Sequence, residues 1–146
     1  MGTIVVGVDG SAGSAEALRF ALAEAKLRGA KLKAVTAWTL TYVAAPIGMM
    51  APIDEGLIPE LEENARVVLE KAVDDALGIT PGVEVERAVL EGTPPQVLVQ
   101  AAQGADLLVV GTRGHGGFAG LLLGSVSQQA AHHAPCPVVI VPHPKG

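Results

Sequence analysis

Five short apolar runs, separated by segments with helical spacing, constrain this chain more than any other feature of its sequence. The runs span residues 3–9, 31–38, 83–89, 106–111 and 136–142. Most are continuous stretches of Val, Leu, Ile and Ala, and the chain is 49% apolar but only 3% aromatic. Continuous apolar strands are typical of a parallel sheet that is buried on both faces. We therefore expect an α/β fold.

The segments between the runs predict helices, so the order βαβαβαβαβ fits a single domain of residues 1–146. Residues 14–29 carry apolar side chains at helical spacing, with Ser14 as the expected cap and Gly29 as the expected end. A later helix is expected to start with Thr93 as its cap and Pro94 at its first position. Residues 125–134 predict the last helix.

Between the second and third runs, a helix is expected from about Pro59 to Leu77, with Gly78 at its end. One face of it carries apolar side chains at Leu61, Ala65, Val68, Ala72 and Ala76. Residues 39–56, which precede it, have no clean period and exceed the usual length of a connection. Two interpretations fit this segment: a disordered insert, or a lid, which its apolar character favours.

Right-handed crossovers would give a five-stranded parallel doubly wound sheet with helices on both faces. Two strand orders fit this pattern, 3-2-1-4-5 and 2-1-3-4-5. Ligands bind beyond the carboxyl ends of the strands where the connections diverge. In the first order that point lies between strands 1 and 4, which end in GVDGSAGS (7–14) and GTRGHGG (111–117). In the second it flanks strand 3, whose exit LEGTPP (90–95) offers little chemistry, so we predict 3-2-1-4-5.

Charge and cysteine content limit the partners of the chain. A net charge of −5 with scattered basic residues gives no attraction for nucleic acid or an anionic membrane. One cysteine, no signal-like segment and no 18-residue apolar span favour a reducing cytoplasm. Residues 107–146 contain no carboxylate, either by chance or because a polyanion binds there.

The densest glycine segment follows the fourth run. The Walker pattern fails because Gly117 stands where lysine is required, and the dinucleotide fingerprint fails because no acid follows Asp106. What remains is Gly111-x2-Gly114-x9-Gly124-Ser125. Backbone N–H groups of such a loop, and of the helix start after it, can point at phosphate oxygens, and the helix dipole favours the same negative charge.

With these motifs, the sequence resembles the ATP-binding branch of the universal stress protein family. The stretches that carry the resemblance are VVGVDGS (5–11), ADLLVVGTRGHGG (105–117), LLLGSVS (121–127) and HHAPCPVVIV (132–141). They extend over the whole chain. The resemblance implies a Rossmann-like, adenine nucleotide α hydrolase-like fold, and a homodimer paired along Val138 to Val141.

The resemblance also implies a site for ATP with Mg²⁺. Asp9, with Gly7 and Val8 before it, would lie by the ribose or a phosphate-bound Mg²⁺, and the backbone of Ala37 would contact adenine. The residues implied on the ribose and phosphate side are Val110, Gly111, Arg113, Gly114, Gly124, Ser125, Val126 and Ser127. Arg113 stands where the family often has histidine, so it either binds phosphate or points to solvent.

Three functional readings remain open. The first is an ATP-binding stress or signalling protein; the others are a slow nucleotide hydrolase and a binding module for AMP or cyclic AMP. Fast turnover is not expected, because the sequence has no Walker lysine and no evident base to position water. For several residues a purely structural role is an alternative to a role in binding. Asp9 could cap a turn, His132 and His133 could interact with a helix dipole, and Cys136 could be an inert packed thiol.

Overall fold

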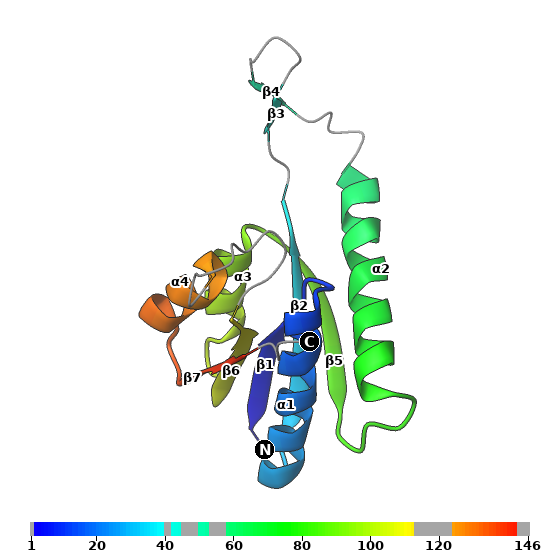
Figure 1. Ribbon diagram of the computed structural model, residues 1–146, viewed down its shortest axis with the longest axis vertical. Helices are drawn as coiled ribbons and strands as arrows, with labels where there is room; N and C mark the ends of the chain where they lie inside the picture. Colours follow the sequence, from blue (N-terminus) through cyan, green and yellow to red (C-terminus); the bar gives the residue numbers. More distant parts are fainter. Residues whose placement is uncertain (1, 40–41, 45–49, 53–57, 113–123, 143–146) are drawn as a thin grey trace.

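The computed structural model describes residues 2–39, 42–44, 50–52, 58–112 and 124–142. Within them, a five-stranded parallel sheet has the order β5-β2-β1-β6-β7 (Figure 1). The strands are β1 (Thr3–Gly7), β2 (Lys31–Trp38), β5 (Val85–Glu91), β6 (Leu107–Gly111) and β7 (Val138–Val141). Taken in chain order these are the five expected strands, so the predicted order 3-2-1-4-5 is confirmed.

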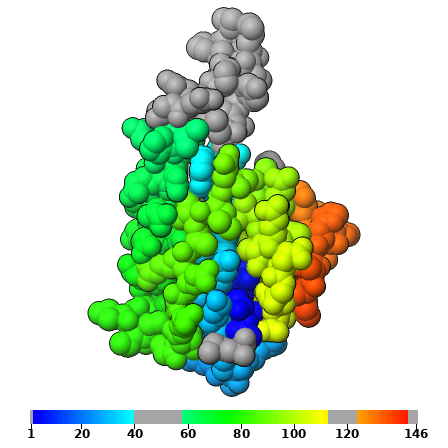
Figure 2. Space-filling model, turned by 180° about the vertical axis from the view of Figure 1, so that it is seen from behind, coloured from blue at the N-terminus to red at the C-terminus, as the bar shows by residue number. Residues whose placement is uncertain are grey.

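Four helices of the described chain cover the two faces of this sheet. They are α1 (Ala12–Arg28), α2 (Ile58–Leu77), α3 (Pro94–Ala101) and α4 (Ser125–His133). On one face, α1 packs on β1 and β6 while α2 packs on β2 and β5. On the other, α3 and α4 contact each other, and Figure 2 shows them from that side in yellow and orange. None of the described helices is both long enough and apolar enough to cross a bilayer.

Alternate residues of β1 enter two separate apolar cores, which explains why its sequence is continuously apolar. Ile4 and Val6 are fully buried under α1 and α2, while Val5 is fully buried on the side of α3 and α4. Since side chains alternate across a strand, a strand covered on both sides leaves no position for a polar residue. The central strand is therefore held rigidly where it ends, at Gly7.

The start of α1 differs from the expectation. Ser11, not Ser14, is the N-cap, because its Oγ accepts a hydrogen bond from the Ser14 backbone N–H at 3.2 Å. At the other end Gly29 takes the left-handed conformation (φ 64°), as predicted. Thr93 and Pro94 occupy the expected first positions of α3, but the Thr93 side chain makes no capping hydrogen bond. β5 begins at Val85, two residues later than expected.

Ser11→Ala is expected to lower the free energy of unfolding by about 1 kcal/mol, because α1 then loses its capping acceptor. Chemical denaturation monitored by circular dichroism measures this change. Thr93→Ala is the matched control, since Thr93 precedes a helix without capping it and its loss should cost less. An equal loss in the two variants would contradict the assignment of Ser11 as the functional cap.

The buried face of α2 is rotated from the predicted one. Its buried residues are Ala65, Leu69, Val73 and Leu77, with Ala72 and Ala76 partly buried. Val68, which the spacing placed in the core, is 37% exposed. The apolar stripe that includes Val68 and the one that includes Leu69 are related by a rotation of about 100° around the helix axis. Both fit helical spacing, so the sequence pattern alone could not decide which stripe faces the core. The rotation turns Val68 toward the carboxyl end of the sheet, where it lines a cavity.

Ion pairs fix α2 against the edge strand β5. Arg87 of β5 donates to Glu70 and, at 2.9 Å, to Asp74 Oδ1, so one guanidinium joins two successive turns of the helix. Surface pairs contribute little stability individually, but a guanidinium that binds two carboxylates restricts how the helix can slide. The position of α2 matters because its first turns form one wall of the cavity.

Residues 39–56 contain a feature that the sequence did not predict. β3 (Tyr42–Ala44) and β4 (Met50–Pro52) pair antiparallel as a two-stranded sheet. Residues 40–41, 45–49 and 53–57 lie outside the described part of the chain. The interpretations of this segment as a lid or as a disordered insert therefore stay predictions.

Candidate functional site

A cavity of about 320 Å³ lies at the carboxyl ends of β1, β2 and β6. Its volume falls within the range of small-molecule sites, roughly 300–1,000 Å³. The described residues that line it are Gly7, Val8, Asp9, Ser11, Ser14, Val35, Thr36, Ala37, Asn64, Ala65, Val68, Pro94, Leu98, Val110, Gly111 and Val126. Most of this wall is apolar, with polar groups concentrated where β1 ends.

The cavity coincides with the switch point of the sheet. From β1 the chain passes to α1 on one face, and α4, which follows β6 in sequence, lies on the other. Adjacent parallel strands whose connections diverge leave a crevice between their ends. The turns that bound this crevice lie close together: a Cβ on Gly111 would be 3.0 Å from the carbonyl C and O atoms of Gly13. At the start of α4, the Gly124 N–H donates to the carbonyl of Thr112.

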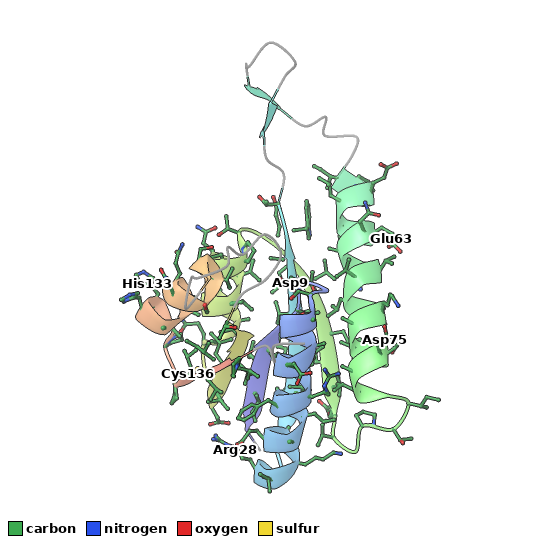
Figure 3. All side chains as sticks on the ribbon, viewed as in Figure 1. Asp9, Arg28, Glu63, Asp75, His133 and Cys136 are labelled. Carbon is green, nitrogen blue, oxygen red and sulfur yellow. The ribbon has the colours of Figure 1, made fainter. Side chains whose placement is uncertain are left out.

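Asp9 occupies the end of β1 at this crevice, as Figure 3 shows. Its Oδ1 accepts a hydrogen bond from the Ser11 N–H at 2.9 Å, and its own N–H lies 3.4 Å from Ser14 Oγ. The turn-capping role that the sequence allowed is therefore present. Within the described residues no hydrogen bond to Asp9 Oδ2 is found, so this carboxylate oxygen remains available to a ligand or to water.

Thr36 is a site residue that sequence reasoning missed. It is 5% exposed, and its hydroxyl donates to the Val8 carbonyl at 2.9 Å, while the Val8 N–H donates to the Val35 carbonyl at 2.9 Å. These bonds continue the pairing of β1 with β2 one residue past Gly7. The feature of the sequence that could have identified Thr36 as a site residue is its hydroxyl inside the otherwise apolar run AVTAW.

The main chain of Ala37 faces the cavity. The carbonyl of the next residue, Trp38, accepts a hydrogen bond from Gly92 on the β5 side. Because main-chain polar groups alternate in direction along a strand, the N–H and C=O of Ala37 point the opposite way, toward the β1 side. There β1 has already ended, so this donor and acceptor lie beside each other at the cavity wall.

The structure places the predicted site residues in three groups. Seven of them line the cavity: Gly7, Val8, Asp9, Ala37, Val110, Gly111 and Val126. Gly124, Ser125 and Ser127 form the start of α4 without lining the described cavity wall. Ser127 is 1% exposed, and its hydroxyl lies 3.0 Å from the carbonyls of Thr112 and Gly124, so its hydrogen is directed into the protein. Arg113 and Gly114, with His115, lie outside the described residues.

Two helices contribute lining residues that the sequence gave no reason to select. Asn64, Ala65 and Val68 come from α2, and Pro94 and Leu98 from α3. A Cβ on Gly7 would lie 2.9 Å from Leu98 Cδ1, so the glycine allows α3 to approach β1 closely. This approach narrows the cavity between the two helical layers. No local sequence pattern marks contacts of this kind.

The charges around the cavity limit which ligands it can hold. Among the described lining residues Asp9 is the one ionisable side chain, and none is Lys or Arg. The described chain contains no cluster of three His, Cys, Asp or Glu residues suited to a metal. A single carboxylate fits a Mg²⁺ ion that keeps several waters and takes further oxygens from phosphates, the usual mode for nucleotide-bound Mg²⁺.

Cys136 lies away from the cavity, just before β7, as Figure 3 shows. Burial, and then the negative charge of Asp106, raise the pKa of its thiol. We therefore expect slow alkylation by iodoacetamide at pH 7.5, slower than for a free cysteine, with the rate still rising above pH 9. Mass spectrometry of the time course measures this rate. Alkylation at pH 7.5 as fast as for free cysteine would contradict the inert role assigned to this thiol.

Comparison with known proteins identifies relatives of the whole chain. The model of the "Universal stress protein family" matches residues 1–142. A universal stress protein of Thermus aquaticus is 38% identical over 141 residues, covering 95% of this chain and 97% of that protein. Another, from Mycolicibacterium smegmatis, is 39% identical over 144 residues, but this chain spans only 47% of its length. The chain spans about half the length of most of the curated relatives compared.

Solved structures agree in fold. A universal stress protein in complex with cAMP is 33% identical, with a TM-score of 0.69 over 98% of both chains. The universal stress protein of Archaeoglobus fulgidus in complex with dAMP is 27% identical, with a TM-score of 0.59 over 97% of this chain and 98% of that one. The strand order, the crevice and these full-length matches agree, and the chain belongs to the universal stress protein family.

Proposed function

We propose that this protein binds ATP with Mg²⁺ in the cavity between β1 and β6, and acts in a stress response or in signalling. The observation that carries the proposal is the convergence of the β1 and β6 exits, Asp9 and Gly111, on one cavity at the switch point of the sheet. Two relatives of the same fold were solved with the adenine nucleotides cAMP and dAMP.

The adenine base would bind at the Ala37 end of the cavity. There a main-chain donor and acceptor point the same way, as the Watson–Crick edge of adenine requires: N1 accepts from the N–H, and the N6 amino group donates to the C=O. The surrounding lining is apolar, with Ala65, Val68 and Leu98 contributing to it. An apolar slot with one polar edge suits a purine base.

The triphosphate would extend toward β6 and α4. In that direction we expect main-chain N–H groups to bind the phosphates in place of basic side chains: those of the predicted glycine loop with Gly114, and those of Ser125 and Val126 at the start of α4. The N–H of Gly124, which the sequence had also suggested, already donates to the Thr112 carbonyl and would support the loop instead. The described residues beyond Asp106 hold no carboxylate. Amides at a helix start favour an anion through their hydrogen bonds and through the helix dipole. The hydroxyl of Ser127 would instead hold this segment against Thr112.

Asp9 would hold Mg²⁺ through its Oδ2 or bind the ribose, since its Oδ1 already accepts from Ser11. Bound Mg²⁺ would neutralise phosphate charge beside this carboxylate. No base is placed beside Asp9 among the described lining residues, so any hydrolysis should be slow. A binding module for AMP or cyclic AMP is the second candidate, which the complexes with cAMP and dAMP favour.

Mass spectrometry of the small molecules that co-purify with the protein tests the proposal without assuming the ligand. We expect ATP, or another adenine nucleotide, to be released on denaturation at close to one molecule per chain. A single-turnover assay then separates binding from hydrolysis. A protein that carries no nucleotide and shows no saturable uptake of ATP, AMP or cyclic AMP would refute the proposal.

We further propose a cytoplasmic homodimer paired along Val138 to Val141. β7 is an edge of the sheet, and its four residues are only partly buried. An apolar edge strand favours pairing with a second strand. Sedimentation equilibrium of the wild-type protein should give twice the mass of the chain. In Ile140→Lys the measured mass should fall toward that of a single chain. A wild-type protein that sediments as a single chain at all concentrations would contradict this assembly.

A further inference from the structure

Asn64 is distinguished from the other polar residues of the cavity by its hydrogen bonding. Asp9, Ser11 and Ser14 bond to one another at the end of β1, and Thr36 donates to Val8. Asn64 also lines the cavity, yet its amide has no hydrogen-bond partner within the described residues. Asn64 is exposed at the rim of the cavity, and its amide offers two unused donors and an unused acceptor oxygen, whereas the Ser11 hydroxyl already accepts from Ser14.

The position of Asn64 follows from the rotation of α2. Asn64 and Val68 are four residues apart, so they lie on one helix face, and both line the cavity. Ala65 beside them is 9% exposed and also lines the cavity, while Leu69 is fully buried in the core and fixes the angle of that face. Arg87 holds the same helix further along through Glu70 and Asp74. The amide is therefore presented by a fixed helix rather than by a loop.

We infer that Asn64 determines the base specificity of the site by reading the N6 and N7 atoms of adenine. This inference rests on the proposed function. A base that binds Ala37 through N1 and one N6 hydrogen leaves N7 and the second N6 hydrogen unpaired. An asparagine amide matches that pair, because its NH₂ donates to N7 and its oxygen accepts from N6.

Guanine cannot satisfy the same arrangement. Its O6 and N7 are both acceptors, so the carbonyl oxygen of an asparagine amide would face an acceptor. At Ala37 the mismatch is repeated, since guanine presents an acceptor where adenine presents N6–H. Val68 would meanwhile pack beside the base without contributing to the choice. Asn64 therefore recognises adenine by hydrogen bonds that are separate from those made by the main chain of Ala37.

The test compares ATP with 7-deaza-ATP, in which carbon replaces N7 and the acceptor is lost. Calorimetry with nucleotide-stripped protein measures both dissociation constants in the presence of Mg²⁺. Wild-type protein should bind ATP about fivefold more tightly than 7-deaza-ATP, the effect of one hydrogen bond. In Asn64→Leu, which keeps the number and branching of the side-chain heavy atoms and favours helix more than asparagine does, the two constants should become equal.

Glu63→Gln is the matched control, because Glu63 is the exposed neighbour of Asn64 and does not line the cavity. The charge that it removes affects both nucleotides equally, so the ratio should stay at the wild-type value. A wild-type ratio of one, or a fivefold ratio that persists in Asn64→Leu, would overturn the role of Asn64 while leaving nucleotide binding established. Failure of wild-type protein to bind either nucleotide would overturn the proposed function, and this inference with it.

Discussion

Gly111→Val is expected to abolish nucleotide binding and to lower the free energy of unfolding by about 1–3 kcal/mol. The added Cβ would meet the backbone of Gly13 at 3.0 Å, and the two methyl groups beyond it need still more room. Backbone cannot move aside as a flexible side chain can. The start of α1 must therefore shift away from β6, which displaces Ser11 and Ser14 from the cavity wall.

Gly78→Ala is a control variant that should be destabilised to a similar extent as Gly111→Val. Gly78 has a φ of 74°, so alanine there costs about 1–2 kcal/mol, but its Cβ would meet no atom within 4 Å and it does not line the cavity. Urea unfolding and calorimetry with MgATP should show both variants destabilised and only Gly111→Val unable to bind. If Gly111→Val binds as tightly as Gly78→Ala, the convergence of the two turns does not shape the site.

Leu69→Ala should destabilise the protein by about 2–5 kcal/mol, whereas Val68→Ala, one residue earlier, should cost less than about 1 kcal/mol. Leu69 is fully buried against the sheet, and its truncation leaves a cavity in the core under α1 and α2. Val68 is 37% exposed and lines the cavity proposed to bind nucleotide instead. Its truncation should weaken nucleotide binding severalfold at little cost in stability.

Denaturant midpoints and calorimetric affinities of these two variants give opposite rankings if α2 is oriented as observed. Val67→Ala is the control on the same turn, because Val67 is 55% exposed and does not line the cavity. It should change neither quantity. Equal destabilisation by Leu69→Ala and Val68→Ala would instead favour the register that the sequence spacing predicted.

The sheet could be predicted from the sequence because its strands are buried on both faces. Continuous apolar runs such as LLVVG have few alternatives in a chain with regular helical segments between them. The strand order needed a functional argument, since the unusual exits after Gly7 and Gly111 favoured placing strands 1 and 4 together. That reasoning also brought Asp9, Val110 and Gly111 to one cavity, as the structure has them.

The features that could not be predicted from the sequence depend on how the helices are oriented against the sheet. Val68 and Leu69 are both apolar, and only the packing of α2 on the sheet decides which one is buried. Asn64 and Leu98 enter the site through that packing and through the close approach of α3 to Gly7. Ser11 and Ser14 are equally good caps by residue type, and the helix start is decided by the turn at Asp9.

We expect this protein to bind a triphosphate through main-chain amides rather than through basic side chains. Calorimetric titration of nucleotide-stripped protein with MgATP measures this binding, in wild-type protein and in Gly114→Val and Ser125→Ala. We expect saturable binding of one nucleotide per chain, lost in Gly114→Val and weakened in Ser125→Ala. Affinity unchanged in both variants would contradict binding of the phosphates by these main-chain amides.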